Sequence, residues 1–525
     1  MDRRFFLKMA GVGLGLAGGE LSASRVMAQV SGSTLVWGSS MSPSLDPHAQ
    51  LDNPSMFTQV NVYDSLYIYE GKDIAPKPWL VRTVSQSSDG ILYDFTLRSG
   101  VKFHDGVPLT AADAVYSLKR AINLGRQLKP VYEAIYDPNE VEQTGELSFR
   151  VKLKKPYGAF LDSLTLLAIV NSKLVEANAG SDMGATWLSG HDAGSGAYAV
   201  VEGSYRAQES LDLVRFADHF DPGKIERILL RPIKDDSTRL LALLKGDIDA
   251  TTPYLRPEQI DRLLKSDDVE IVKSAPQRIF MINMNNARPP FDNRNFRKAL
   301  ACLFPYDLYV TRLLKGQVLA NRGPIPETLL GDGWEPTNAY SYDLDKAKEH
   351  LAAARSEGAD VDRPLEFLSA IGFDETLTVG QLMQSEMRKV GLDVVVGKSA
   401  YADFVKRVQN VETTPDFWSI WVPSYYYDPN AYLAPYTEAT HGTTRGAAWY
   451  SDKQTEEMIQ KASQTTNAEA RQKLYRDITE RLLDQSPSIW IYNGGYVRGV
   501  RSRVEGFQPD AIGDGVRVSK LTISG

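Results

Sequence analysis

Strand-like and helix-like segments alternate along most of this 525-residue chain, and this alternation limits the folds open to it. Residues 34–37, 228–231 and 280–283 are short apolar runs typical of strands. Amphipathic runs lie between them, and one helix is expected over residues 344–355 behind Asp343. The alternation predicts an α/β protein with mixed sheets.

Length and composition indicate a globular protein of several domains. At roughly 100–200 residues per domain the chain accommodates about three units, and 43% apolar residues supply their cores. The net charge of −7 argues against a nucleic-acid partner. A single cysteine, Cys302, excludes an intramolecular disulfide and any multi-cysteine metal site. The six histidines match no zinc motif, and the chain has neither a G-x-S-x-G nucleophile elbow nor a P-loop motif. We therefore expect no cofactor, no metal and no catalytic residue.

The N-terminus has the pattern of an export signal. Arg3 and Arg4 precede the sequence FFLK and a Gly-rich apolar run over residues 9–17, and small residues end the segment at Ala28. This resembles a twin-arginine signal, although Asp2 stands where Ser or Thr is usual. An ordinary secretory signal with a basic start is the alternative. Either interpretation predicts export, cleavage near Ala28 and a periplasmic protein.

Local signals predict several helix ends and turns. Thr110, with Asp113 three residues later, is expected to begin a helix, and Ser237 and Gly246 are expected to cap another. Residues 93–98 read as a strand that forms a hairpin through the Asp-Gly turn at 105–106. Two prolines predict a loop with exposed backbone over residues 41–47.

Aromatic residues are concentrated in one part of the chain. Residues 401–450 contain three tryptophans, seven tyrosines and two phenylalanines, whereas the whole chain is 10% aromatic. Within this part, a strand-like run breaks at Pro423 into a tyrosine-rich loop that ends at Asp428-Pro429. Tyrosine combines a rigid apolar face with a polar hydroxyl, which suits a recognition surface. The alternative, which is compatible with the first, is that these rings bury a junction between lobes.

One block of sequence resembles a known family. Residues 97–118, LRSGVKFHDGVPLTAADAVYSL, are very close to the signature of the extracellular solute-binding proteins of ABC importers, in the class of dipeptide, oligopeptide and nickel receptors. Further matches follow in the family's order at 63–66 (YDSL), 76–80 (PKPWL), 194–198 (GSGAY), 243–249 (LLKGDID), 290–300 (PFDNRNFRKAL), 342–348 (YDLDKAK) and 428–429 (DP).

The resemblance implies a periplasmic-binding-protein-like fold: two α/β lobes with mixed sheets joined by a hinge, plus an extra domain inserted in the first lobe. It places the first lobe at residues 29–72, 193–288 and 488–525, the inserted domain at 73–192 and the second lobe at 289–487. It also implies a monomeric receptor, not an enzyme, that captures a solute by hinge closure and delivers it to the membrane permease of an ABC importer.

The resemblance further nominates residues that border the solute. They come from the loop after the first strand, the start of the second lobe, the tyrosine-rich loop and the return to the first lobe. These candidates are Met41, Asn283, Asn285, Trp418, Trp421, Tyr425, Tyr426, Tyr427, Asp428 and Asn493. His104 belongs to the signature of the inserted domain and is expected to be scaffold.

One candidate departs from the family pattern. Peptide receptors of this class commonly place an aspartate three residues before the Asp-Pro pair to hold the peptide's ammonium group, and this chain has Tyr425 there. Asp428 is the alternative source of that charge, but Pro429 favours a turn role for it. The hypothesis is a solute that is less cationic at this end: a peptide or modified peptide, an opine-like conjugate or an oligosaccharide.

Two other classes of function remain open from the sequence. A secreted hydrolase with paired carboxylates is compatible with 66 acidic residues, although no motif favours it. A haem-scavenging or chaperone-like periplasmic role is the second, and the scattered histidines make a dedicated haem site weak.

Overall fold

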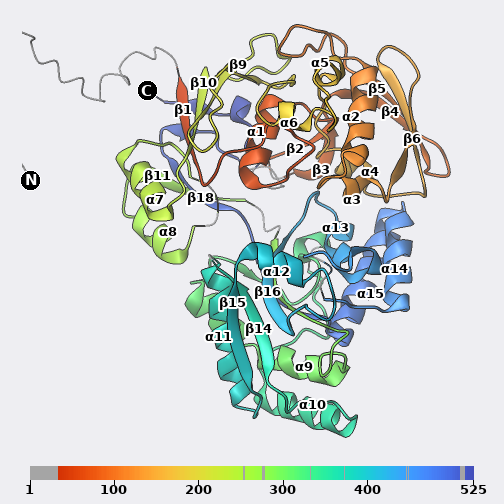
Figure 1. The fold of residues 1–525 in the computed structure, drawn as a ribbon, viewed down its shortest axis with the longest axis vertical. Helices are drawn as coiled ribbons and strands as arrows, with labels where there is room; N and C mark the ends of the chain where they lie inside the picture. The colour runs from red at the N-terminus through yellow and green to blue at the C-terminus, as the bar shows by residue number, and fades with distance from the viewer. Residues whose placement is uncertain are drawn as a thin grey trace, which may run out of the picture.

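The structure, a computed structural model, describes residues 33–71, 73–251, 253, 255–274, 278–331, 333–371, 373–444, 446, 448–508 and 515–524. The expected export signal at residues 1–28 lies outside this part of the chain. Two bodies lie one above the other in Figure 1, and mixed sheets with flanking helices confirm the predicted α/β class.

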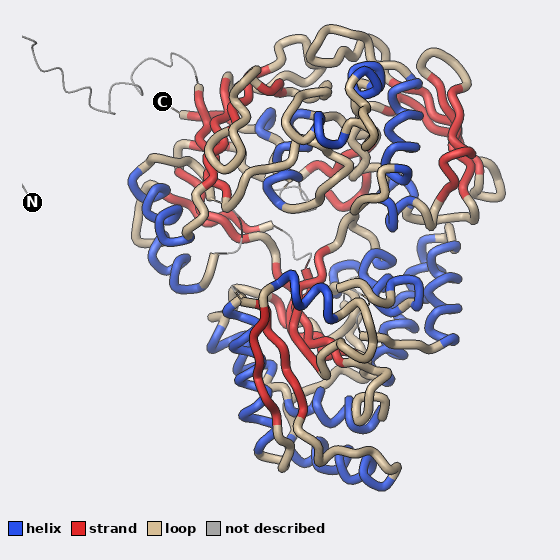
Figure 2. The backbone as a smooth tube through the Cα atoms, viewed as in Figure 1, coloured by secondary structure: helices blue, strands red, loops and turns tan. Residues whose placement is uncertain are grey.

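The second lobe, residues 278–494, is built on a six-stranded mixed sheet in the order β13-β17-β12-β16-β14-β15. Figure 2 shows helices along both flanks of this sheet. Its strands are β12 (Arg278–Met284), β13 (Leu319–Ala320), β14 (Leu365–Ala370), β15 (Val394–Ser399), β16 (Phe417–Pro423) and β17 (Ser488–Gly494). Its helices are α9 (Arg294–Leu303), α10 (Leu344–Ser356), α11 (Asp374–Arg388), α12 (Tyr401–Arg407), α13 (Pro429–Leu433), α14 (Lys453–Gln464) and α15 (Ala468–Gln485).

The first lobe holds a four-stranded sheet in the order β1-β10-β9-β8, in which β1 and β10 are parallel. Its strands are β1 (Thr34–Ser39), β2 (Tyr67–Glu70), β3 (Asp73–Pro78), β8 (Tyr198–Val200), β9 (Leu211–Arg215), β10 (Arg227–Pro232), β11 (Val269–Lys273), β18 (Val497–Arg501), β19 (Val504–Glu505) and β20 (Thr522–Ile523). Its helices are α1 (Asn53–Val62), α5 (Ser172–Ala177), α6 (Ala185–Leu188), α7 (Asp236–Lys245) and α8 (Pro257–Leu263).

The inserted domain is a separate antiparallel sheet, β4-β5-β7-β6, at the right of the first lobe in Figure 1. Its elements are β4 (Val81–Gln86), β5 (Leu92–Leu97), β6 (Tyr136–Gln143), β7 (Ser148–Leu153), α2 (Ala111–Asn123), α3 (Lys129–Tyr132) and α4 (Phe160–Ser163). The remaining helical segments of the described chain are a π-helix, Leu308–Leu313, and 3₁₀ turns at Glu327–Leu329, Ala434–Tyr436, Glu438–Thr440 and Val518–Lys520.

The chain passes between the lobes twice, from β11 to β12 and from β17 to β18. β11 pairs with β18 in the first lobe, and β12 pairs with β17 in the second. The two crossing segments also bond each other, because Ser274 N donates to Tyr496 O (2.9 Å) and Tyr496 N to Ser274 Oγ (2.8 Å). Since β12 and β17 belong to the six-stranded sheet, we place the lobe boundaries at these crossings rather than at residues 288 and 488.

The structure confirms some of the predicted helix ends and corrects one cap and one hairpin. The helix behind Asp343 is confirmed, and Gly246 ends α7 with a φ of 82°. The cap of α7 is Asp235 rather than Ser237, because the Asp235 carboxylate accepts from Thr238 N at 2.8 Å. The hairpin prediction for residues 93–106 is wrong, because β5 already has β4 and β7 on its two edges.

The proline-containing loop after β1 is less exposed than predicted, because a buried ion pair holds it. Asp46 and Arg120 of α2 are both fully buried, and their side chains meet at 2.7 and 2.8 Å. A second buried carboxylate, Asp64, accepts from Trp79 Nε1 (2.7 Å) and Ser195 Oγ (2.8 Å). Arg120 lies within the inserted domain, and Trp79 and Ser195 lie on either side of it, so these contacts fasten the inserted domain to the first lobe. Removing Arg120 would leave Asp46 as an unmatched buried charge.

No helix in the described chain combines the length and apolar character that a membrane span requires.

The GSGAY motif has a steric explanation that can be tested. Gly196 N donates to Val62 O, and a Cβ on Gly194 would lie 1.9 Å from that same carbonyl oxygen. We therefore expect Gly194→Ala to lower the free energy of unfolding by about 3 kcal/mol or more, since backbone must move to relieve the overlap. The measurement is the urea midpoint beside Gly145→Ala, whose Cβ would meet nothing nearer than 3.6 Å. Equal midpoints for the two variants would contradict this explanation.

Candidate functional site

The two lobes touch on the side of α8, where charged side chains extend from both. Arg256, the N-cap of α8, lies 4.0 Å from Asp374 at the start of α11. Lys315 of the second lobe is ion-paired with Asp261 of α8. These contacts bring the start of α11 close to α8, so the surfaces beside them face each other across the crossing strands.

On the opposite side, tyrosines from both lobes meet in one cluster. The interlobe tyrosine cluster consists of Tyr69 and Tyr157 before and within the inserted domain, and Tyr426 and Tyr427 of the second lobe. Tyr157 Oη lies 2.5 Å from Tyr426 Oη, and Tyr427 N donates to Tyr69 Oη at 3.0 Å. Figure 1 places α13 below the inserted domain, in agreement with these contacts.

Two carboxylates border the interlobe tyrosine cluster. Asp428 is paired with Arg471 at 2.7 Å, and Asp162 of α4 accepts from Tyr69 Oη at 2.9 Å. Burial, together with the nearby charge of Asp428, raises the pKa of Asp162 to about 7. A carboxyl that changes charge near neutral pH therefore lies where the inserted domain meets the second lobe.

Most of the tyrosine-rich loop is buried in this cluster. Tyr426, Tyr427 and Asp428 are only 6%, 5% and 4% exposed, so they bury the junction between the lobes. Asp428 also caps α13 by accepting from Asn430 N at 2.8 Å, which is the turn role that Pro429 favoured. Tyr425 is half-buried at the edge of the cluster.

The two candidate tryptophans differ in position. Trp418 is fully buried and packs with Leu368, Phe404 and Val408 in the second lobe. Trp421 is half-buried; its Nε1 donates to Tyr492 Oη at 3.0 Å, and its ring lies 4.7 Å from that of Phe280. Only Trp421 of the pair contacts the ring of Phe373, at 6.2 Å, in the surface next to Asp374.

The three candidate asparagines are buried in the second-lobe sheet. Asn283 and Asn285 are fully buried at the end of β12 that is far from the crossing. Asn283 accepts from Ser488 Oγ at 2.9 Å, and Asn285 Nδ2 donates to Val411 O at 3.0 Å. Asn493, near the crossing, is 4% exposed. The structure therefore does not bring these side chains together with the exposed candidates.

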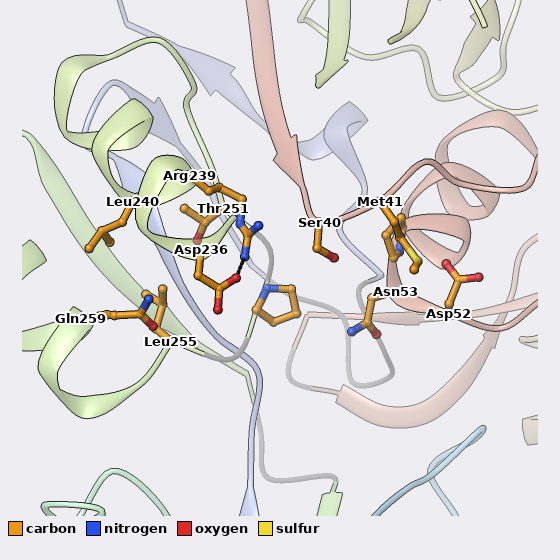
Figure 3. Close-up of a pocket in the computed structure, with 12 residues that line it drawn as sticks. Ser40, Met41, Asp52, Asn53, Asp236, Arg239, Leu240, Thr251, Leu255 and Gln259 are labelled. Atoms are coloured by element: carbon orange, nitrogen blue, oxygen red, sulfur yellow. Dashed lines mark hydrogen bonds and ion pairs between the residues drawn. The ribbon is translucent and has the colours of Figure 1, made fainter. Parts of the chain in front are cut away.

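Met41 lies at the first-lobe pocket, a cavity of about 290 Å³ (Figure 3). The pocket is bounded by the loop after β1, the start of α1, α7 and α8. Its lining residues are Ser40, Met41, Asp52, Asn53, Pro54, Asp236, Arg239, Leu240, Thr251, Pro253, Leu255 and Gln259. Apart from Met41, sequence reasoning missed these residues, because no local pattern shows that the loop after β1 and the helices α1, α7 and α8 meet around one cavity.

An exposed aromatic surface on the second lobe was also missed. Phe373 and Tyr401 are 39% and 49% exposed, and their ring centroids lie 5.7 Å apart. Beneath them, Glu375 accepts from Tyr309 Oη and Tyr492 Oη at 2.9 and 2.8 Å. Burial raises the pKa of the Glu375 carboxyl. Tyr401 lay within the aromatic-rich stretch, but sequence alone did not show that it would face outward beside Phe373.

In the described ranges, no group of three or more histidine, cysteine, aspartate or glutamate side chains is arranged to hold a metal ion.

Comparison with known proteins identifies relatives along nearly the whole chain. The family model "Bacterial extracellular solute-binding proteins, family 5 Middle" matches residues 75–444. The glutathione-binding protein GsiB of Pectobacterium atrosepticum is 26% identical over 525 residues, covering 97% of each chain. The probable D,D-dipeptide-binding periplasmic protein DdpA of Escherichia coli K12 is 25% identical over 486 residues, covering 90% of this chain and 91% of that protein.

Solved structures share the fold at lower identity. The periplasmic binding protein DppA from Helicobacter pylori, in complex with the peptide STSA, has a TM-score of 0.79 at 21% identity and covers 94% of this chain and 98% of its own. AgaA from A. tumefaciens R10, in complex with agropinic acid, has the same TM-score and identity, covering 94% and 99%. Both comparisons support the two-lobe arrangement.

The raised pKa of Asp162 predicts that the difference in free energy of unfolding between the natural protein and Asp162→Asn depends on pH. Between about pH 4 and pH 7 the folded protein holds a proton on Asp162 that the unfolded chain has lost, so this group's contribution falls as pH rises through that window. The asparagine side chain in Asp162→Asn is uncharged at every pH in this range. We expect it to be more stable than the natural protein by about 1–3 kcal/mol at pH 8, with the difference vanishing near pH 4.

Denaturant unfolding at the two pH values measures this difference, with the exposed carboxylate Asp267→Asn as the control. A difference that is the same at both pH values would contradict the assignment of the effect to Asp162.

Proposed function

The chain belongs to the bacterial extracellular solute-binding proteins of family 5, and on that premise we propose that it captures a small solute between its two lobes for an ABC importer. The observation that carries the proposal is the pair of crossing strands, with the first-lobe pocket on one side and the aromatic surface around Phe373 on the other. Rotation about the crossings would bring these surfaces onto a solute.

The proposed reaction cycle contains no covalent step. The closed, loaded form presents both lobes to the permease, and opening releases the solute, so the protein acts as a receptor and not as an enzyme. We propose that it does so as a monomer. The neighbouring carboxylates Asp162 and Asp428 are engaged by Tyr69 and Arg471 at the junction between the lobes, so we place them in the scaffold and favour the receptor over the hydrolase and haem-scavenging alternatives.

We infer that the solute is a peptide or a peptide-like conjugate. The names of the relatives support this range: GsiB is named as glutathione-binding, DdpA as probably D,D-dipeptide-binding, and AgaA was solved in complex with agropinic acid. Tyr425 supplies a hydroxyl and an aromatic face but no charge, which favours a modified peptide or an opine-like conjugate over a free amino terminus at this position. An oligosaccharide is the second choice, because tyrosine and tryptophan rings also suit sugars.

We propose further that residues 1–28 direct the protein through the twin-arginine route to the periplasm, with cleavage near Ala28. The adjacent arginines Arg3 and Arg4 before the apolar run support this proposal. A twin-arginine signal is recognised by a receptor through this arginine pair.

A thermal-shift screen of the mature chain tests the solute class. Peptides with blocked amino termini, opine-like conjugates and oligosaccharides are compared with free dipeptides. A solute at 100 times its Kd should stabilise the protein by about 2.7 kcal/mol. Tyr425→Asp is expected to strengthen the binding of free dipeptides about tenfold or more, because it restores an anionic partner for ammonium. Tyr425→Phe is the matched control, and preference for free dipeptides by the natural protein would contradict the inference.

Export is tested with the paired substitution Arg3→Lys and Arg4→Lys. We expect the precursor to stay in the cytoplasm, with the mature periplasmic fraction reduced at least tenfold, because lysine keeps the charge but loses the guanidinium geometry. Cell fractionation and immunoblotting provide the measurement. Lys8→Arg is the control, and unchanged export of the double variant would indicate an ordinary secretory signal instead.

A further inference from the structure

We propose that the first-lobe pocket binds a positively charged group of the captured solute, an ammonium or a guanidinium, with Asp236 as its counter-ion. The inference rests on the proposed receptor function and adds the chemical class of the group that enters this pocket. Its volume of about 290 Å³, at the lower end of small-molecule pockets, suits one side chain or small head group.

The charges that line the pocket favour a cation. The ionisable lining residues are Asp52, Asp236 and Arg239, so the lining carries one more negative than positive charge. Two helices begin here, α1 and α7, and their free N–H groups would otherwise favour an anion. Both starts are already capped, because Asp52 accepts from Ser55 N at 3.0 Å and Asp235 from Thr238 N at 2.8 Å.

Arg239 is not available to a ligand anion. Its side chain is 8% exposed, and its guanidinium donates to Ile233 O and to the Asp236 carboxylate, as the dashed line in Figure 3 shows. Asp236, in contrast, is 56% exposed at its side chain, and only its Oδ1 is in this pair. Its second oxygen therefore gives the pocket an accessible anionic acceptor next to a buried, satisfied arginine.

Polar and apolar groups around Asp236 fit the rest of such a solute. Gln259 is 7% exposed; its Oε1 accepts from Arg256 N at 2.9 Å, while its Nε2 has no hydrogen bond within the described residues. Met41, Leu240 and Leu255 supply apolar lining for an aliphatic stem. The pocket therefore matches a solute chain that carries a carbonyl and ends in a cation. The buried Gln259 amide can donate to the carbonyl, the exposed Asp236 carboxylate can pair with the cation, and the apolar walls can cover the stem.

The facing lobe carries compatible chemistry. Asp374, next to the exposed ring of Phe373, lies 4.0 Å from Arg256, which precedes α8. Aromatic faces attract cations and also cover apolar stems, so the second lobe would close over such a group without an opposing charge from Phe373 or Tyr401. In this proposal the negative charge that pairs with the solute comes from Asp236 of the first lobe, because Tyr425 of the second lobe has none.

The test measures binding by calorimetry with three matched dipeptides, Ala-Lys, Ala-norleucine and Ala-Glu, each acetylated at its amino terminus so that only the second side chain differs in charge. The natural protein should bind Ala-Lys at least tenfold more tightly than Ala-norleucine, with a ratio that falls as salt is added. Asp236→Asn should reduce the ratio to about twofold or less, whereas Asp236→Glu should retain most of it. Asp345→Asn, which removes a first-turn carboxylate from α10, is the matched control and should leave the ratio unchanged.

The outcomes separate this inference from the proposed function. Equal binding of Ala-Lys and Ala-norleucine, tighter binding of Ala-Glu, or no binding of Ala-Lys at millimolar concentration would overturn the cation assignment, while saturable binding of any other solute would preserve the receptor function. If Asp236→Asn fails to fold, two other results decide whether the pocket binds a cation. These are the ratio of Ala-Lys to Ala-norleucine affinity in Asp236→Glu and the salt dependence of that ratio in the natural protein. Absence of saturable binding across all solute classes would overturn the receptor function itself.

Discussion

The arrangement of this protein depends on two strand crossings that hydrogen-bond to each other. β11 and β18 form a ladder in the first lobe, β12 and β17 form one in the second, and two hydrogen bonds between Ser274 and Tyr496 join the crossing segments. Ladders resist bending because each strand residue is fixed by its neighbours, so rotation between the lobes is concentrated at the crossings. The pocket, the aromatic surface and the interlobe tyrosine cluster are all positioned by this constraint.

The inserted domain makes lobe movement more costly than the crossings alone would. Any opening that separates it from the second lobe breaks the contacts of Tyr157 with Tyr426 and of Tyr69 with Tyr427, and exposes the apolar groups packed around them. Asp162 lies at this contact with a pKa near neutrality. The free energy that holds the inserted domain against the second lobe is therefore expected to depend on pH, in addition to any dependence on the solute.

The surfaces proposed to meet the solute differ in chemistry between the lobes. The first-lobe pocket is lined by Asp52, Asp236, the buried Arg239 and neutral side chains, whereas the exposed surface around Phe373 and Tyr401 is aromatic. Between them, Trp421 is held by its hydrogen bond to Tyr492, which in turn donates to Glu375. This buried network fixes the orientation of Trp421, so the aromatic surface proposed to meet the solute is preorganised.

Local sequence chemistry was enough to predict much of the scaffold. The helix behind Asp343 and the left-handed Gly246 follow from interactions between residues a few positions apart, which is why they could be read directly. The cap of α7 was missed by two residues, because Asp235 and Ser237 are both competent caps and only the path of the chain selects between them. The family resemblance supplied the two-lobe order that no local pattern contains.

The sequence by itself determined the α/β class, the family and the presence of a tyrosine-rich loop before Asp428. Only the tertiary structure decided that Tyr426 and Tyr427 bury the junction between lobes, that Asn283 and Asn285 are enclosed in the sheet, and that Asp236 and Gln259 line a pocket with Met41. The physical reason is that helix capping depends on neighbours in sequence, whereas exposure and the meeting of side chains depend on distant segments that packing brings together, such as Tyr157 and Tyr426, which are 269 residues apart.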